Sequence, residues 1–460
     1  MTRPNQAATT RRTMSRRRSV VFIPVAIGAL LGSLGVVSVS AAPPTTDASE
    51  VIHWNQIATS TLIGIPGPDG GAPPAFQINM GIVQGAVYDA VNAIGPRHHQ
   101  PYLLKKRTGA KASVDAAVAT AAYDVLWNLV STAPERAPFA TRPALLAALT
   151  TARDATLGPI NAGTSKSQGI AIGHAAAKAM LDARAADGRF GPSQWDGSSG
   201  VGKWQPLSPT ALDPTPWVGG VKPFFLQSSS QFRSVPPPAL NTAQWATEFN
   251  EVKNLGRATG STRDDSPAQM QTYKAKWWQS APGLSWNEVA RQLIARNDLN
   301  AANAARLLAL QNMSGADAAI NCWNDKYHFD FWRPWNAITT TLDDGNAGTT
   351  TDPSWTALIT APYPEWTSGH NCLDASQVSV LRLFFGDTPG TFQITSASTF
   401  LVPAESKVRM FDTFSQPLAE LIEARIWAGL HYRSADVAGQ VLGNNVARYA
   451  IAHYLLPVGH

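Results

Sequence analysis

The segment Lys326-Tyr-His-Phe-Asp-Phe-Trp-Arg333-Pro334 lies in the last third of a 460-residue chain. Lys326 and Arg333 are seven residues apart, which is two turns of an α-helix, so a continuous helix would point both cations the same way. Pro334 would then end or kink that helix. Two cations at this spacing more often form a solvated face, so the segment suggests a binding site only in combination with other segments.

A second segment, Thr367-Ser368-Gly369-His370, follows Pro362-Tyr363-Pro364 at a point where a loop is expected to enter a helix. A hydroxyl, a glycine amide and an imidazole can converge there on an anion, because the N-terminus of a helix is its positive end. The same tripeptide on its own usually marks a turn.

A third segment, Arg425-Ile-Trp-Ala-Gly429-Leu-His431, continues to Asp436. Arg425 and His431 are expected near the end of a helix, and Gly429 between them allows close approach of another backbone. Taken alone, the histidine is more simply explained as a buried side chain that hydrogen bonds to the backbone.

Together the three segments supply the donors that a buried oxyanion needs. An anion with two or three negative charges requires several charge-assisted hydrogen bonds when it leaves water. One histidine can bind the central atom, and the other can move protons. The predicted set comprises three cations, a hydroxyl, an amide and two imidazoles, from Lys326, Arg333, Arg425, Ser368, Gly369, His370 and His431.

The order K-x6-RP, then SGH, then R-x3-G-x-H resembles the phosphatidic acid phosphatase type 2 superfamily, which includes vanadium haloperoxidases and bacterial acid phosphatases. The first segment is most similar to the chloroperoxidase branch, since Trp323 stands three residues before the lysine and an F-x-F-W-R-P run follows. The resemblance implies an all-α fold of helical bundles with long irregular loops.

The resemblance also implies a role for each matching residue. His431 would be the axial ligand of vanadate, or the nucleophile if the bound species were a phosphoester. Lys326 would polarise bound peroxide and His370 would act as the acid–base residue. The equatorial oxygens would be bound by Lys326, Arg333, Ser368, Gly369 and Arg425, and the halide path would run past Trp323 and Tyr363.

Two positions depart from the family pattern. Thr367 stands where the motif usually has proline before Ser-Gly-His. The motif also places an aspartate four residues after the second histidine, but here that position is Ala435 and the acid is Asp436. The role of Asp436 in orienting His431 is therefore in doubt.

The function expected from the resemblance is a vanadate-dependent haloperoxidase that oxidises halide with hydrogen peroxide and serves a small organic acceptor. The first alternative is an acid phosphatase, acting on monoesters or lipids, with His431 as nucleophile and His370 as general acid. The second is a non-catalytic secreted helical protein that keeps an anion pocket. Aromatic residues around Trp323 and Tyr363 favour the peroxidase, because they would form an apolar mouth suited to a soft halide.

The first 41 residues have the features of an export signal. They contain six arginines and no acid, an apolar run follows Val20, and small residues end at Ala42 before Pro43. The paired arginines resemble a twin-arginine signal, which implies a periplasmic or extracellular protein. An uncleaved membrane anchor is the alternative. Without these residues, 31 basic and 32 acidic residues remain, so neither nucleic acid nor stable membrane association is expected.

The rest of the chain is predicted to be mainly helical, with an N-terminal helical region at 42–240 and a C-terminal catalytic region at 241–460. Two irregular segments, 187–240 and 341–367, interrupt the helical pattern, and the second precedes the candidate site. Cys322 and Cys372 would form either a disulfide or two buried thiols, and the oligomeric state is not determined. The predicted helices lie near 51–62, 78–94, 114–129, 141–157, 166–186, 241–256, 266–278, 286–312, 315–332, 369–385, 404–431 and 434–455.

Overall fold

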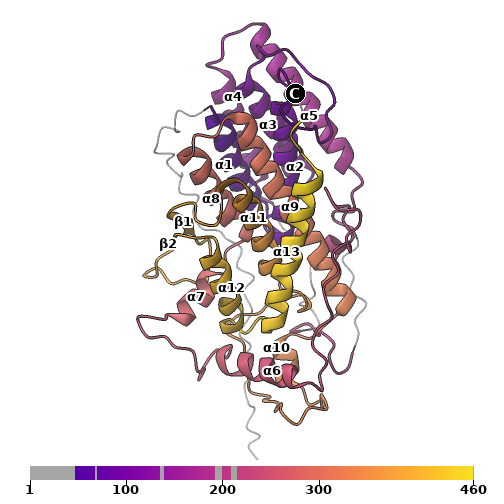
Figure 1. Ribbon diagram of the computed structural model, residues 1–460, viewed down its shortest axis with the longest axis vertical. Helices are drawn as coiled ribbons and strands as arrows, with labels where there is room; N and C mark the ends of the chain where they lie inside the picture. The colour runs from indigo at the N-terminus through magenta and orange to yellow at the C-terminus, as the bar shows by residue number, and fades with distance from the viewer. Residues whose placement is uncertain (1–46, 68–69, 135–138, 192–198, 209–214, 459–460) are drawn as a thin grey trace, which may run out of the picture. The chain divides into compact units, whose positions relative to one another are not determined.

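Helix α9 (Ala301–Phe329) is the central element of the fold (Figure 1). The side chain of Asn300 caps its start by accepting a hydrogen bond from the amide of Asn303 at 2.9 Å. Most residues from Ala301 to Lys326 are buried, whichever face of the helix they occupy. A helix that is buried on all faces must be surrounded by other elements, and α9 is packed against α2, α8, α11 and α13.

The all-α prediction is confirmed by thirteen α-helices and one small sheet in the part of the chain that the computed structural model describes, residues 47–67, 70–134, 139–191, 199–208 and 215–458. Strands β1 (Phe392–Thr395) and β2 (Val408–Phe411) pair antiparallel, with Phe392 opposite Phe411. The other elements are α1 (Ser49–Ile63), α2 (Pro73–Asn92), α3 (Val114–Thr132), α4 (Arg142–Leu157), α5 (Thr164–Arg184), the 3₁₀-helix η2 (Pro216–Gly220), α6 (Ala243–Leu255), α7 (Gln271–Trp277), α8 (Pro282–Arg296), α10 (Pro334–Thr339), α11 (Gly369–Phe385), α12 (Ser415–Trp427) and α13 (Arg433–His453).

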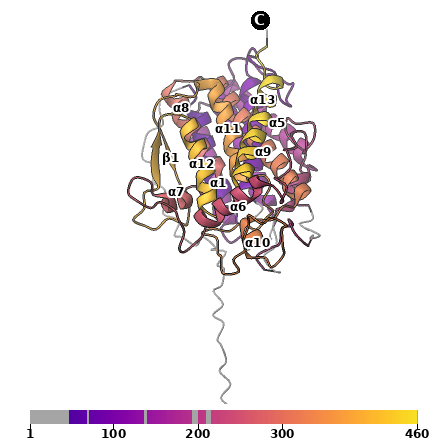
Figure 2. The ribbon, with the colours of Figure 1, turned by 60° about the horizontal axis from the view of Figure 1, so that its bottom comes forward.

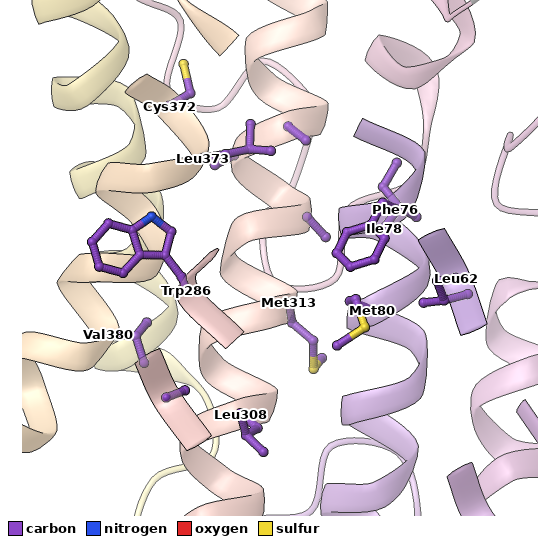
Figure 3. Close-up of a cluster of buried hydrophobic side chains, with 14 of the residues drawn as sticks. Leu62, Phe76, Ile78, Met80, Trp286, Leu308, Met313, Cys372, Leu373 and Val380 are labelled. Carbon is purple, nitrogen blue, oxygen red and sulfur yellow. The ribbon is translucent and has the colours of Figure 1, made fainter. Parts of the chain in front are cut away.

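Two groups of helices cover α9. Helices α2, α3 and α5 pack together on one side, and α11 and α13 lie side by side on another (Figures 1 and 2). Figure 3 shows Met80 of α2 and Met313 of α9 pointing toward each other in the core between these helices, and both are fully buried. This packing fixes α9, whose C-terminal end carries Lys326.

The prediction of a helix break near residues 312–315 is wrong, because α9 continues through Gly315. A Cβ atom at Gly315 would lie 2.7 Å from Nε2 of Gln77, so the glycine permits close packing of α2 rather than a break. The break falls earlier, between α8 and α9, where Asp298 has a φ of +48°. The helix predicted for 404–431 begins only at Ser415, because β2 occupies 408–411.

The shared-helix explanation for Lys326 and Arg333 is also wrong. Helix α9 ends at Phe329, and Asp330 adopts a left-handed conformation with φ of +50°. Arg333 is the N-cap residue of the next helix, α10, and Pro334 is its first residue. The two cations therefore come from separate elements, and only tertiary structure can bring them together.

The irregular segment 215–240 is fastened to one face of α9 by buried polar side chains. Asp317 accepts hydrogen bonds from the amides of residues 224, 225 and 226 at 2.6, 2.7 and 3.0 Å. Asn321 accepts from the amide of residue 232 at 2.9 Å, and Asp325 accepts from that of residue 234 at 3.0 Å. These acceptors lie four residues apart, one per helical turn, so the segment follows the helix.

The predicted export signal lies outside the described residues, and its role stays a prediction. Residues Ala42–His460 form one compact unit. None of the helices in the described ranges combines the length and the apolar character that a membrane span requires.

Candidate active site

Arg333 joins the first and third sequence segments. Its guanidinium group is fully buried, and Nε donates to the carbonyl of Tyr363 at 2.9 Å. Nη1 donates to the carbonyl of Leu430 at 2.7 Å and lies 3.1 Å from Nε2 of His431. An arginine that begins α10 thus contacts a histidine nearly one hundred residues later.

Lys326 joins the first and second segments. The side chain is fully buried, and Nζ donates to the carbonyls of Pro364, Glu365 and Thr367 at 3.1, 3.1 and 2.5 Å. Burial lowers the pKa of Lys326 to about 8, and the charge of Arg333 acts in the same direction. All three ammonium protons hold the 363–367 loop, so direct donation to a bound anion would require Lys326 to release one carbonyl.

Ser368 and Gly369 form the start of α11, as the sequence predicts. Ser368 is the N-cap residue, and its hydroxyl accepts from Nδ2 of Asn371 at 3.2 Å. A Cβ atom at Gly369 would lie 3.2 Å from the ring of Trp323, so a larger residue would crowd the indole. The N-terminus of α11 therefore packs against the indole ring of Trp323.

His370 is partly buried and contacts the segment between α7 and α8. Its Nε2 lies 3.2 Å from the carbonyl of Ser280. Because a carbonyl can only accept, Nε2 carries the proton in the neutral ring and Nδ1 is left as the acceptor. Burial and the charge of Arg425 hold the pKa of His370 well below its usual value. The residue is therefore a neutral base near cations.

Arg425 lies in the last turn of α12 and is 3% exposed. Its Nη1 donates to Oε1 of Gln279 at 3.0 Å. The turn after α12 depends on Gly429, which has a φ of +76° and would place a Cβ atom 2.6 Å from the carbonyl oxygen of Gly256. This confirms the close approach that the sequence predicts at Gly429, and it brings His431 back toward Arg425.

His431 is a neutral imidazole among positive charges. Burial lowers its pKa well below the usual value, and the charges of Arg333, Lys326 and Arg425 lower it further. Of these cations, Arg333 contacts the ring, at 3.1 Å from Nε2, whereas Lys326 and Arg425 act on it only through their charge. Hydrogen bonds join the three segments in pairs, from Arg333 to Leu430, from Lys326 to Thr367 and from Ser368 to Ala435. That their side chains bind one anion stays a prediction.

The acid that contacts His431 is Glu365, not Asp436. Oε1 of Glu365 lies 2.9 Å from Nδ1 of His431 and accepts from the amide of Tyr432 at 3.1 Å. Burial raises the pKa of Glu365 to about 8, against the effect of the neighbouring cations. Asp436 accepts instead from Asn371 at 2.8 Å, so the offset from four to five residues turns it toward α11.

Sequence reasoning did not identify Glu365. The available signal was a carboxylate inside the aromatic and proline-rich run Tyr363-Pro-Glu-Trp366. An acid in such an apolar context must have a partner when it is buried.

Trp323 and Tyr363 form an aromatic pair beside Lys326. Their ring centroids are 5.1 Å apart, and Nζ of Lys326 lies 5.6 and 5.3 Å from the two rings. The two cysteines are buried free thiols on either side of Thr367, whose hydroxyl lies 3.4 Å from Sγ of Cys322 and 3.2 Å from Sγ of Cys372. The alternative of two buried thiols thus describes this structure.

The donor set fits an oxyanion. Nη2 of Arg333 and Nε of Arg425 are buried and have no hydrogen-bond partner among the described residues. A buried charged donor without a partner is costly, and an anion between these groups would satisfy both. In the same ranges, no group of three or more His, Cys, Asp or Glu side chains is placed to hold a metal cation.

Residues 306–458 match the family model described as the VCPO second helical-bundle domain. This part of the chain is similar to the vanadium haloperoxidases. It is 25% identical over 213 residues to the vanadium chloroperoxidase of Curvularia inaequalis, a match that covers 39% of this chain. The match covers 34% of that protein, so the chain spans about a third of the length of this curated relative.

Two solved vanadium haloperoxidases have similar folds. A bacterial vanadium-dependent iodoperoxidase has a TM-score of 0.71 at 23% identity, with 89% of this chain and 98% of that chain covered. A bacterial vanadium-dependent chloroperoxidase in its holo form has a TM-score of 0.63 at 18% identity, with 86% and 94% covered. At these identities the likeness shows the fold, and the chemistry must be argued from the site.

Proposed function

We propose that this protein is a vanadate-dependent haloperoxidase, which uses hydrogen peroxide to oxidise a halide to a hypohalous-acid equivalent. The observation that carries the proposal is the contact at 3.1 Å between Nε2 of His431 and Nη1 of Arg333. Because a guanidinium group only donates, Nε2 carries no proton, and its lone pair would become available to an oxyanion when Nη1 of Arg333 moves from the ring nitrogen to an oxygen of that anion. That arrangement suits a histidine that binds the central atom of an oxyanion.

Each residue of the site would have a separate role in binding vanadate. His431 would hold the central atom through Nε2, and the partnerless donors of Arg333 and Arg425 would bind oxygens. Lys326 would add positive charge to the site while Nζ donates to carbonyls of the 363–367 loop. When bound, vanadate supplies the Lewis acid that activates peroxide toward attack by halide.

His370 would handle the proton that peroxide must lose on binding. Its Nε2 is held by the carbonyl of Ser280, which leaves Nδ1 to accept a proton. The low pKa of this ring keeps it neutral and able to accept at ordinary pH. Trp323 and Tyr363 would exclude water from the mouth of the site and accommodate a polarisable halide.

The test is halide oxidation by purified protein that has been stripped of phosphate and vanadate. We expect an organic halogen acceptor to be halogenated only when orthovanadate, peroxide and halide are all present. Hydrolysis of a phosphate monoester without any halogenation would instead favour the acid phosphatase, in which His431 attacks phosphorus. Failure of both reactions, together with vanadate binding that His431→Ala leaves unchanged, would favour the non-catalytic protein.

We also propose export of the protein, on the basis of the basic and apolar sequence of residues 1–41. The test is fractionation of cells that express the full chain, followed by N-terminal sequencing of the product. A mature N-terminus close to Ala42 in an extracytoplasmic fraction would support the proposal, and full-length protein in the cytoplasm would contradict it.

A further inference from the structure

Two independent contacts fix the tautomer of His431. Nη1 of Arg333 can only donate, so Nε2 of the ring is an acceptor and carries no proton. The proton of the neutral ring must then be on Nδ1, where Oε1 of Glu365 accepts it at 2.9 Å. The same oxygen also accepts from the amide of Tyr432, so it is the acceptor whatever the charge of the carboxyl group.

We infer that Glu365 is the positioning residue of His431, and that it holds the ring with Nδ1 protonated and with an unprotonated Nε2 facing Arg333, where the oxyanion would bind. This inference rests on the proposed function for the identity of the anion. The orientation of the ring itself follows from the contacts of the protein alone.

The backbone of Glu365 is held on both sides. Its amide donates to the carbonyl of Phe331 at 3.0 Å, and its carbonyl accepts from Nζ of Lys326 at 3.1 Å. Its side chain is fully buried. A carboxylate fixed in this way can orient its partner ring, because neither its backbone nor its rotamer is free to change.

Asp436, the acid that the sequence offers for this role, is bonded elsewhere. Asp436 is fully buried and accepts from Nδ2 of Asn371 at 2.8 Å. The family motif would place an acid at position 435, which is alanine here. The loop before α11 therefore supplies the carboxylate that the helix after His431 does not.

The first measurement is the tautomer of His431 in protein free of vanadate and phosphate. Protein labelled with ¹⁵N-histidine distinguishes a protonated from an unprotonated ring nitrogen by chemical shift, and His431→Ala assigns the signal. We expect Nδ1 protonated in the wild type and in Glu365→Gln, whose amide oxygen can still accept. In Glu365→Leu, we expect loss of this single tautomer.

The second measurement is vanadate affinity by equilibrium dialysis. We expect the affinity to fall about 10-fold in Glu365→Gln and at least about 100-fold in Glu365→Leu, the range typical for groups that orient a ligand. Asp317→Asn is the matched control, since it also removes a buried carboxylate that accepts backbone amides, and we expect neither the tautomer nor the affinity to change.

An unchanged tautomer and an affinity within twofold of wild type in either variant would overturn the inference. If Glu365→Leu does not fold, Glu365→Gln decides the matter alone, by its affinity. A wild type that binds no vanadate would contradict the proposed function, whereas the tautomer would still test Glu365. The two failures are therefore distinguishable.

Discussion

The segment 215–240 and the loop 363–367 are both irregular, and both are held by side chains in or just after the C-terminal half of α9. Acceptors hold the first segment, and cations hold the second. Acids and an amide at positions 317, 321 and 325 accept from backbone amides of the first segment. Cations at positions 326 and 333 donate to backbone carbonyls of the second. The carboxylate of Asp317 accepts from three amides, so its hydrogen-bonding capacity is used. The guanidinium group of Arg333 donates to the loop only through Nε, so its other N–H groups are available for other acceptors.

This difference explains why one segment is structural and the other belongs to the site. Of the Arg333 nitrogens that the loop does not bind, Nη1 contacts Nε2 of His431, and Nη2 is buried with no partner among the described residues. Long irregular segments thus need not share a purpose, and the sign of the charge that fastens them indicates which one can bind an anion.

The largest effect is expected from removal of Arg333, the cation that holds the loop and would also bind the anion. In Arg333→Ala we expect kcat for halide oxidation to fall about 10³-fold, since one preorganised donor alone contributes up to about that factor. Arg233→Ala is the matched control, because Arg233 lies in the segment 215–240 and forms an ion pair with Asp325 of α9. Steady-state kinetics with saturating vanadate make the comparison, and equal losses in the two variants would contradict it.

A second test uses the proton of Lys326. Because burial lowers the pKa of Lys326 to about 8, the unliganded site loses this charge as pH rises above 8, whereas a bound anion favours the charged form. Vanadate affinity should therefore fall with rising pH in that range, by up to about tenfold per unit from this group alone. The measurement is the affinity of wild type relative to Lys326→Arg, which stays charged. A constant ratio between pH 7 and 9.5 would sink the prediction.

A third test removes the hydrogen bonds between Asp317 and the segment 215–240. Asp317→Ala leaves three buried amides without their acceptor, so the free energy of unfolding should fall by about 3 kcal/mol. Activity per folded molecule should stay within about twofold of wild type, because the segment 215–240 holds none of the anion-binding side chains. Urea denaturation and kinetics at low temperature give the two values. A large loss of kcat in fully folded protein would show that this segment also shapes the site.

The smallest expected effect is at Asp436. Asp436→Asn keeps an oxygen that can accept from Asn371, and it does not alter the contact between Glu365 and His431. We expect vanadate affinity to change by less than about fivefold, which is less than for Glu365→Gln. A larger effect at Asp436 than at Glu365 would reverse the assignment of the orienting acid.

Local sequence determines where several of the helices of this protein begin. The cap at Ser113, which accepts from the amide of Ala116 at 3.1 Å, and the start of α11 at Gly369 are both where the sequence predicts them. Helical periodicity and caps depend on residues within one or two turns, so the sequence alone reveals them. The same holds for the identity of the cations and histidines, since their side-chain chemistry needs no fold.

Only the tertiary structure decided how these groups meet. The sequence suggested that Lys326 and Arg333 share a helix, yet the left-handed Asp330 separates them, and the 363–367 loop brings them together. The pairing of His431 with Glu365 spans 66 residues. Such contacts depend on how helices pack around α9, because a buried donor finds its acceptor across the core rather than along the chain.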